Sequence, residues 1–236
     1  MSVSPNSLAI QRRLQKAEHY NRWIYEAIRA DLGRRILDVG CAVGNVTRRL
    51  LESDPELVIG LDADPAALAE LERSCGGNRV LRTHCLDVTS AELTALTAER
   101  LDTITCLNFL EHIEDDRGLL RSFWQLLEPG GRLILLVPAF PWLYGSMDAA
   151  DHHLRRYRRH ELELAITAAG FSLRRTAYMN MLGVAGWYLN GVVLRRRLLP
   201  ARQLGLFDRL VPLLRKLEGA IGPPFGQSII AVAERP

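Results

Sequence analysis

The chain has 236 residues, of which 48% are hydrophobic and 24% charged, with a formal net charge of +3. This composition is typical of a globular protein with a full core and excludes a disordered chain. The small net charge also argues against a strong binder of phosphate backbones, so we expect no nucleic-acid partner.

Helical spacing of apolar residues predicts a helix over about residues 7–32, with Trp23 and Ile24 packed on a sheet. An apolar run from Arg35 to Val39 then predicts a strand that ends in a glycine turn, Gly40 to Gly44. A helix follows at once, over about residues 45–53. A strand that turns into a helix at glycine presents unpaired N–H groups at a positive helix end. The pattern therefore predicts a nucleotide ligand at the carboxyl edge of a parallel sheet, with a generic glycine turn as the alternative.

The second predicted strand, residues 57–61, ends at Asp62. In nucleotide-binding units an acid at this distance from the glycines binds the ribose hydroxyls. NAD enzymes share this arrangement, so the acid does not identify the cofactor. A short third strand, residues 80–83, is followed by Asp87, which is suited either to a ligand or to capping the helix that starts near Ser90.

The fourth predicted strand, residues 102–107, leads into a polar stretch from Asn108 to His112. Residues at the ends of such strands face the ligand crevice of an open parallel sheet. A helix over about residues 117–127, a Pro129-Gly130-Gly131 turn and a fifth strand over residues 132–137 follow. The continuous apolar run of this fifth strand indicates that both its faces are covered.

Residues 138–160 form an aromatic and arginine-rich segment, which we interpret as a lid over the active site. Four of its arginines (Arg155, Arg156, Arg158 and Arg159) are also compatible with a solvated helix entrance. The histidines His152, His153 and His160 show no complementary ligand set, so we expect no metal site.

A helix over residues 161–169 and a sixth strand over about residues 171–177 precede a helical insertion, residues 178–225. Residues 176–194 carry no charge, but their asparagines and glycines argue against a membrane span. The basic run Arg195-Arg196-Arg197 permits peripheral membrane contact, although we favour packing against the core or a second subunit. Residues 226–233 predict the last strand, and we interpret residues 1–236 as one domain with residues 1–32 as an N-terminal cap.

The stretch Asp38-Val-Gly-Cys-Ala-Val-Gly44 resembles the first motif of class I S-adenosylmethionine-dependent methyltransferases, with Ala42 in place of a glycine. The ordered motifs Asp87-Val88, Leu110-Glu-His-Ile113 and Pro129-Gly-Gly131 are similar to those of the same family. This resemblance implies an α/β fold: a Rossmann-like, doubly wound, mixed seven-stranded sheet with lid insertions after strands five and six. It also implies S-adenosylmethionine as the cofactor, bound by Tyr20, Asp38, Gly40, Cys41, Gly44, Asp62, Ala63, Asp87, Val88, Asn108 and His112. An N-terminal helix across the cofactor would bring Tyr20 or Tyr25 over it.

The family resemblance implies methyl transfer to a small-molecule acceptor in bacterial specialised metabolism, with Tyr178, Asn180 and His112 as candidate catalytic residues. An aromatic pocket with few acids suggests an alternative, in which the cofactor's own amine cyclises its side chain to azetidine-2-carboxylate and releases methylthioadenosine. A non-catalytic cofactor-binding module and an NAD-dependent reductase are further alternatives. We leave open whether the chain forms a homodimer.

The four cysteines (Cys41, Cys75, Cys85 and Cys106) lie far apart, which indicates a reducing compartment without disulfides. The polar N-terminus lacks the layout of a signal peptide. We therefore expect a cytoplasmic protein.

Overall fold

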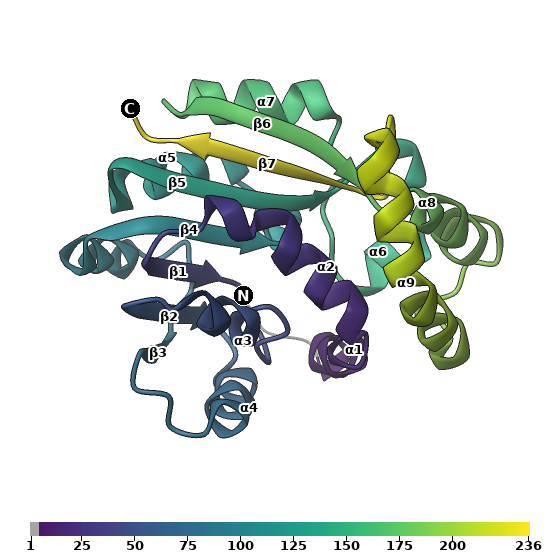
Figure 1. The fold of residues 1–236 in the computed structure, drawn as a ribbon, viewed down its shortest axis with the longest axis horizontal. Coiled ribbons are helices and arrows are strands. Elements are labelled where there is room, and N and C mark those ends of the chain that lie inside the picture. Colours follow the sequence, from purple (N-terminus) through teal and green to yellow (C-terminus); the bar gives the residue numbers. More distant parts are fainter. Residues whose placement is uncertain (1–4) are drawn as a thin grey trace.

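A single mixed sheet organises the computed structural model, which describes residues 5–236 (Figure 1). The strand order is β3-β2-β1-β4-β5-β7-β6, and all neighbouring pairs are parallel except those that β7 makes with β5 and β6. The strands are β1 (Arg35–Val39), β2 (Leu57–Asp62), β3 (Leu81–Cys85), β4 (Leu101–Leu107), β5 (Leu127–Pro138), β6 (Ser172–Met179) and β7 (Ser228–Glu234). The predicted seven-stranded, doubly wound fold is thus confirmed.

Helices cover both faces of this sheet and gather at the end where its parallel strands finish (Figure 1). The α-helices are α1 (Pro5–Gln15), α2 (Glu18–Ile28), α3 (Thr47–Leu50), α4 (Pro65–Cys75), α5 (Asp116–Leu126), α6 (Ser146–Ala150), α7 (Arg159–Ala168), α8 (Met181–Trp187) and α9 (Ala201–Ile221). Short 3₁₀ segments are η1 (Arg29–Asp31), η2 (Leu51–Ser53), η3 (Ala91–Glu99), η4 (Leu110–His112) and η5 (Pro141–Leu143), and η6 (Tyr188–Val193) is a π-helix.

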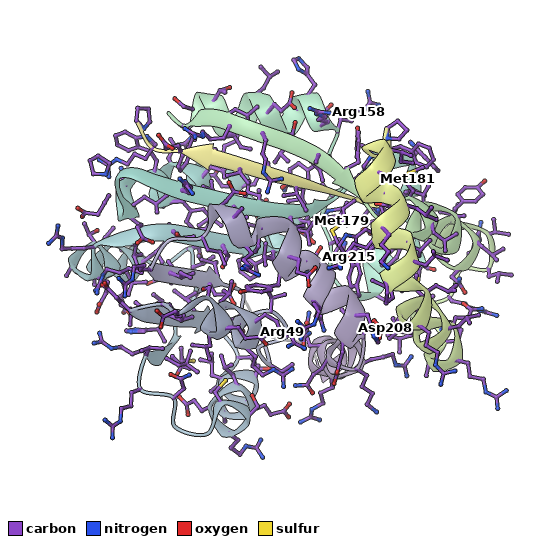
Figure 2. All side chains as sticks on the ribbon, in the orientation of Figure 1. Arg49, Arg158, Met179, Met181, Asp208 and Arg215 are labelled. Atoms are coloured by element: carbon purple, nitrogen blue, oxygen red, sulfur yellow. The ribbon has the colours of Figure 1, made fainter. Side chains whose placement is uncertain are left out.

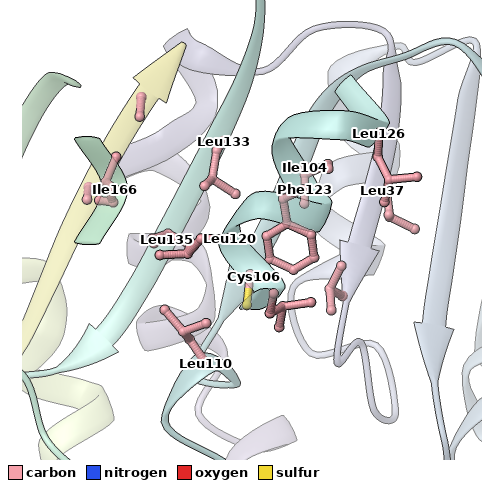
Figure 3. Close-up of a cluster of buried hydrophobic side chains, with 14 of the residues drawn as sticks. Leu37, Ile104, Cys106, Leu110, Leu120, Phe123, Leu126, Leu133, Leu135 and Ile166 are labelled. Atoms are coloured by element: carbon pink, nitrogen blue, oxygen red, sulfur yellow. The ribbon is translucent and has the colours of Figure 1, made fainter. Parts of the chain in front are cut away.

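The main core lies between the sheet and α5. Figure 3 shows Phe123 and Leu120 of α5 close to Ile104 and Cys106 of β4, and all four side chains are fully buried. The helix exposes its polar residues on the other side, so its amphipathic pattern fixes which face meets the sheet. A second core lies under α2, where Trp23 and Ile24 are buried as predicted.

Several predicted boundaries differ from the structure. The first predicted helix is two helices, because the chain breaks at Lys16 and Ala17 between α1 and α2. The Pro-Gly-Gly turn lies within β5, with Gly130 in the left-handed region at φ +79°. The segment after β5, interpreted as a lid, contains η5 and α6. The lengths of short elements depend on tertiary contacts that local propensity does not reveal.

Candidate functional site

The turn after β1 is held in a conformation that favours glycine. Gly40, Ala42 and Gly44 have φ values of +69°, +46° and +81°. A Cβ atom on Gly40 would overlap the Phe109 ring, and one on Gly44 would overlap Leu71. Both positions therefore require glycine, because the left-handed backbone and the close packing act together. Ala42 occupies the third left-handed position, which a residue with a Cβ adopts at some cost.

Asp62 ties this turn to the end of β2. Its carboxylate accepts a hydrogen bond from the backbone N–H of Ala42 at 2.8 Å and another from Asp64 at 2.9 Å. Burial raises the pKa of Asp62, while these backbone donors oppose that rise. The sequence interval from the glycines to this acid therefore corresponds to a direct contact in the structure.

Asp38 lies deeper, near the end of β1. It is 3% exposed, and its two oxygens accept hydrogen bonds from the hydroxyls of Thr47 at 2.6 Å and Thr105 at 2.8 Å. Burial raises the pKa of Asp38 to about 6, against the effect of the two hydroxyl donors. This carboxylate consequently joins β1, α3 and β4 and titrates closer to neutrality than an ordinary aspartate.

Four further predicted cofactor residues lie in the glycine turn or follow β2 and β3. Asp87 accepts hydrogen bonds from the backbone N–H and the hydroxyl of Thr89, at 2.9 and 2.7 Å. Ser90 caps η3, so the alternative of Asp87 as the helix cap is wrong. Val88 and Cys41 are buried in the core, and Ala63 directly follows Asp62.

The N-terminal helix α1 crosses the glycine turn. The Asn45 amide donates to the backbone and side-chain oxygens of Gln11 at 3.2 and 3.1 Å. Arg12 of α1 pairs with Glu70 of α4. The helix that covers this edge is thus α1, whereas Tyr25 is a core residue, 5% exposed, which contradicts its expected place over the cofactor.

Tyr20 lies between α2 and α9, with its ring 5.7 Å from Phe207 and 6.4 Å from Trp23. Its hydroxyl hydrogen-bonds with Ser228 and Asn180, and burial raises its pKa. These contacts place Tyr20 beside the first residue of β7 and the residue that follows β6.

A buried network of charged residues lies under the segment after β5. Asp148 is fully buried and contacts the Arg156 guanidinium at 2.7 Å, the Trp187 indole N–H at 2.9 Å and His153 Nδ1 at 3.0 Å. Arg156 is only 4% exposed, so the expectation of a solvated arginine is wrong at this position. A buried arginine requires a buried acid, and Asp148 provides it.

Glu111 is the residue that sequence reasoning missed. It is fully buried, and neither of its carboxylate oxygens has a hydrogen-bond partner in the described part of the chain. Its Oε1 lies 3.8 Å from His153 Nε2, and burial raises its pKa to about 7. A buried carboxylate without a donor is costly, which marks Glu111 as a group retained for a purpose other than stability.

His112 and His153 complete a donor set with Glu111. Their rings meet edge to face, with centroids 4.8 Å apart. Burial lowers the pKa of His112 to about 4; burial alone would also lower that of His153, but Asp148 and Asp151 raise it to about 9. One ligand atom from each of the three residues lies within 4.8 Å of the others, so the set could hold a divalent cation. The sequence does not reveal this set, because Glu111 and His112 are about 40 residues from His153 and meet it only in the fold.

Beside this network, an aromatic row runs from the end of β6 toward η6. The Phe140 ring stacks on Tyr178 at 5.4 Å and on Trp142 at 5.7 Å, and Trp142 contacts Tyr188 at 6.1 Å. Tyr178 is half-buried. Phe140 and Trp142 of the predicted lid thus form one continuous aromatic surface with Tyr178 and Tyr188.

Asn180, predicted as a catalytic residue, holds the start of α8. It is 2% exposed, and its side chain accepts from the Gly183 N–H and donates to Gln227, each at 2.9 Å. Its φ of +67° and these contacts make it the N-cap of α8. Both polar atoms of its side chain therefore already have protein partners.

Comparison with known proteins gives a family match and a fold match. Residues 37–133 match the family model described as a methyltransferase domain. A ubiquinone biosynthesis O-methyltransferase of Pseudomonas fluorescens is 30% identical over 113 residues, which are 47% of this chain and 47% of that relative. The chain thus aligns with about half the length of the curated relatives it matches.

Solved structures share the fold across most of the chain. A methyltransferase of Mesorhizobium loti, described as dependent on S-adenosylmethionine, has a TM-score of 0.60 at 17% identity and covers 90% of this chain and 98% of its own. The cyclase SpnF has a TM-score of 0.59 at 19% identity and covers 93% of this chain and 81% of its own.

Proposed function

We propose that the chain is a class I S-adenosylmethionine-dependent methyltransferase and that it transfers a methyl group to an oxygen atom of a small-molecule acceptor. The match of residues 37–133 to a methyltransferase-domain model and the likeness of the fold support this proposal. The observation that carries this proposal is the contact between Asp62 and the Ala42 N–H, which joins the glycine turn and the acid of β2 into one site. The name of the curated relatives, O-methyltransferase, supports a hydroxyl group as the acceptor.

The donor set at this edge fits S-adenosylmethionine. Asp62 retains lone pairs for the two ribose hydroxyls, since each carboxylate oxygen accepts more than one hydrogen bond. Asp87 lies two strands from the glycine turn, where an acid would accept from the adenine amino group, and Asp38 supplies negative charge for the cofactor's ammonium. The cover by α1 would shield the bound cofactor from water.

The cofactor supplies a methyl group made electrophilic by its sulfonium. The chain needs to orient the acceptor, exclude water and remove a proton. We assign orientation to Asn108, which is exposed directly after β4 and held at φ +53°, and proton removal to His112. Phe140 and Tyr178 would exclude water and favour the positive charge through their ring faces.

Cyclisation of the cofactor is the second candidate. The stacked rings of Phe140 and Tyr178 favour it, because such a surface would also hold a folded aminobutyl chain. A third candidate, a cofactor-binding module without turnover, needs only Asp62 and the glycine turn.

Incubation of the purified protein with methyl-labelled S-adenosylmethionine separates these candidates. Methyl transfer predicts S-adenosylhomocysteine only when a phenolic acceptor is present. Methylthioadenosine without any acceptor would favour cyclisation, and calorimetric binding without either product across an acceptor panel would favour the module. We also expect His112→Ala to lower turnover while the control His84→Ala, in β3, does not.

The same assay should include dialysis against a chelator followed by addition of zinc, because two imidazoles and one carboxylate suit a transition metal. Unchanged activity would support direct proton removal by His112. Activity lost with the chelator and restored by zinc would instead assign Glu111, His112 and His153 to a bound cation.

A further inference from the structure

Helix α9 has an inner face that packs and an outer face that is apolar without any cover among the described residues. Leu204 and Val211 of the inner face are buried. The outer face carries exposed leucines and an isoleucine that recur every three or four residues and so lie on one side of the helix. They are Leu206 (61% exposed), Leu210 (39%), Leu213 (57%), Leu217 (54%) and Ile221 (64%). A surface helix normally keeps such a stripe only where something else binds it.

The charges of this region are sorted by sign. Asp208 and Glu218 are the only acidic residues between Met181 and Ile221, and both point inward. Asp208 accepts from the Tyr20 N–H at 2.9 Å, and Glu218 accepts from the Met181 N–H at 2.7 Å. Figure 2 shows Asp208 and Arg215 on the side of α9 toward α2, where Arg215 pairs with Glu26. The acids therefore hold α9 to the body of the protein.

The outward charges are basic. Arg202, Arg209 and Lys216 are exposed and recur every seven residues, about two helical turns apart, so they form one line along α9. In a helical-wheel projection, this basic line lies directly beside the apolar stripe of exposed leucines. Arg195 and Arg197, just before α9, are also exposed. Long basic side chains beside an apolar stripe are typical of helices that lie in a membrane interface.

The neighbouring helical segments extend the same surface. Leu182 of α8 and Tyr188, Leu189 and Val193 of η6 are each 45% exposed or more. A groove of about 650 Å³ lies between these segments and α9, lined by Trp142, Leu182, Tyr188, Leu217 and Phe225 among others. Its lining is almost entirely apolar, which suits a hydrocarbon chain.

We infer that the surface formed by α8, η6 and α9 docks on a bilayer that contains anionic lipids. The stripe would enter the hydrocarbon boundary, the groove would take an acyl chain, and the arginines would meet the headgroups. A second copy of this chain fits less well, because an antiparallel twofold contact through this face would set one basic line against the other. None of the described helices is long and apolar enough to cross a membrane, so the contact would be peripheral.

Co-sedimentation with vesicles tests this inference. We expect the protein to pellet with vesicles of phosphatidylcholine and phosphatidylglycerol in equal parts, and much less with phosphatidylcholine alone. Arg209→Glu should weaken binding to the anionic vesicles by more than about fivefold, since each basic charge near such a surface contributes about that factor. Leu213→Glu should weaken it by about tenfold or more, because it places a charge in the apolar stripe.

Two exposed residues of α7 and its entrance serve as matched controls. Leu164→Glu changes a leucine that is 53% exposed, and Arg158→Glu reverses an exposed arginine outside the proposed surface. Neither should change vesicle binding. All four variants should keep the melting temperature and the cofactor affinity of the wild type, so a failure of docking is distinguishable from a failure of the proposed enzymatic function.

Two results would overturn the inference. The first is equal pelleting of the wild type and Leu213→Glu, or no pelleting with either vesicle. The second is a dimer in analytical ultracentrifugation that Leu213→Glu dissociates, without vesicle binding by the wild type. That result would assign the surface to self-association.

Discussion

The edge of β1 and β2 and the segment between β5 and β7 stabilise buried charge in different ways. At the first, Asp38 and Asp62 accept hydrogen bonds from hydroxyls and backbone N–H groups. In the second, Asp148 depends on the charged side chain of Arg156, 2.7 Å away. Carboxylates held by neutral donors remain available to a ligand, whereas a buried ion pair needs each partner to be present. The edge of β1 and β2 is therefore suited to binding a ligand, whereas the Asp148–Arg156 pair stabilises the fold of the segment after β5.

Loss of Arg156 should have the largest effect on stability. Arg156→Ala removes the fully buried cation from Asp148 and leaves His153 as its remaining charged partner, so we expect a loss of up to about 3–5 kcal/mol in the free energy of unfolding. Urea denaturation followed by circular dichroism measures it. The control Arg82→Ala breaks an exposed pair with Glu99 and should cost at most about 1 kcal/mol. Similar losses in both variants would erase the contrast between the regions.

Loss of Asp62 should act mainly on binding. For Asp62→Ala we expect cofactor affinity to fall by about 1–3 kcal/mol, because the ribose hydroxyls lose their acceptor. Isothermal titration measures the change. Asp64→Ala is the matched control: Asp64 caps α4 by accepting from the Ala66 N–H, so its loss should lower stability and leave affinity intact. An unchanged affinity in Asp62→Ala would remove the ribose assignment.

The pH dependence of binding should follow Asp38. Its folded pKa of about 6 lies above the ordinary value of 3.8, so its contribution to stability is fully present below 3.8 and is lost as pH rises through about 6. Attraction for a cationic ligand has the opposite sign, because it needs the ionised form. We expect cofactor affinity to fall about tenfold from about pH 7 to about pH 5. Titration of Asp38→Asn should give a flat profile across this range; a wild-type profile that is already flat would contradict the role of Asp38.

Tyr178→Phe should have the smallest effect. The variant keeps the stack on Phe140 and removes only the hydroxyl, so stability and cofactor affinity should hardly change. We expect kcat to fall by about two- to tenfold, which corresponds to one lost hydrogen bond of about 0.5–1.5 kcal/mol. Steady-state kinetics of both forms would show this, and an unaffected rate would exclude the Tyr178 hydroxyl from the chemistry.

The ligand edge formed by β1 to β4 could be predicted from the sequence, because its residues belong to short motifs with characteristic spacing. The glycines, Asp62 and the strand alternation together define a parallel sheet and its ligand edge. The partners of Arg156 and Glu111 cannot be predicted in this way, because His153 and Glu111 are 42 residues apart in the sequence and 3.8 Å apart in the structure. The hydrogen bond that Asn180 donates to Gln227, just before β7, is a further contact between residues far apart in the sequence. Long-range polar pairing has no local periodicity to reveal it.

The position of β7 between β5 and β6 sets an order of assembly. β7 is the only strand that pairs with β6 in the described sheet, so β6 has no ladder to join until Ser228–Glu234 has been synthesised. Until then β5 has an unpaired edge, and α8 and α9 are synthesised while that edge is still open. The apolar helices therefore emerge from the ribosome before β7 completes the sheet. During this interval the nascent chain is most exposed to misassembly.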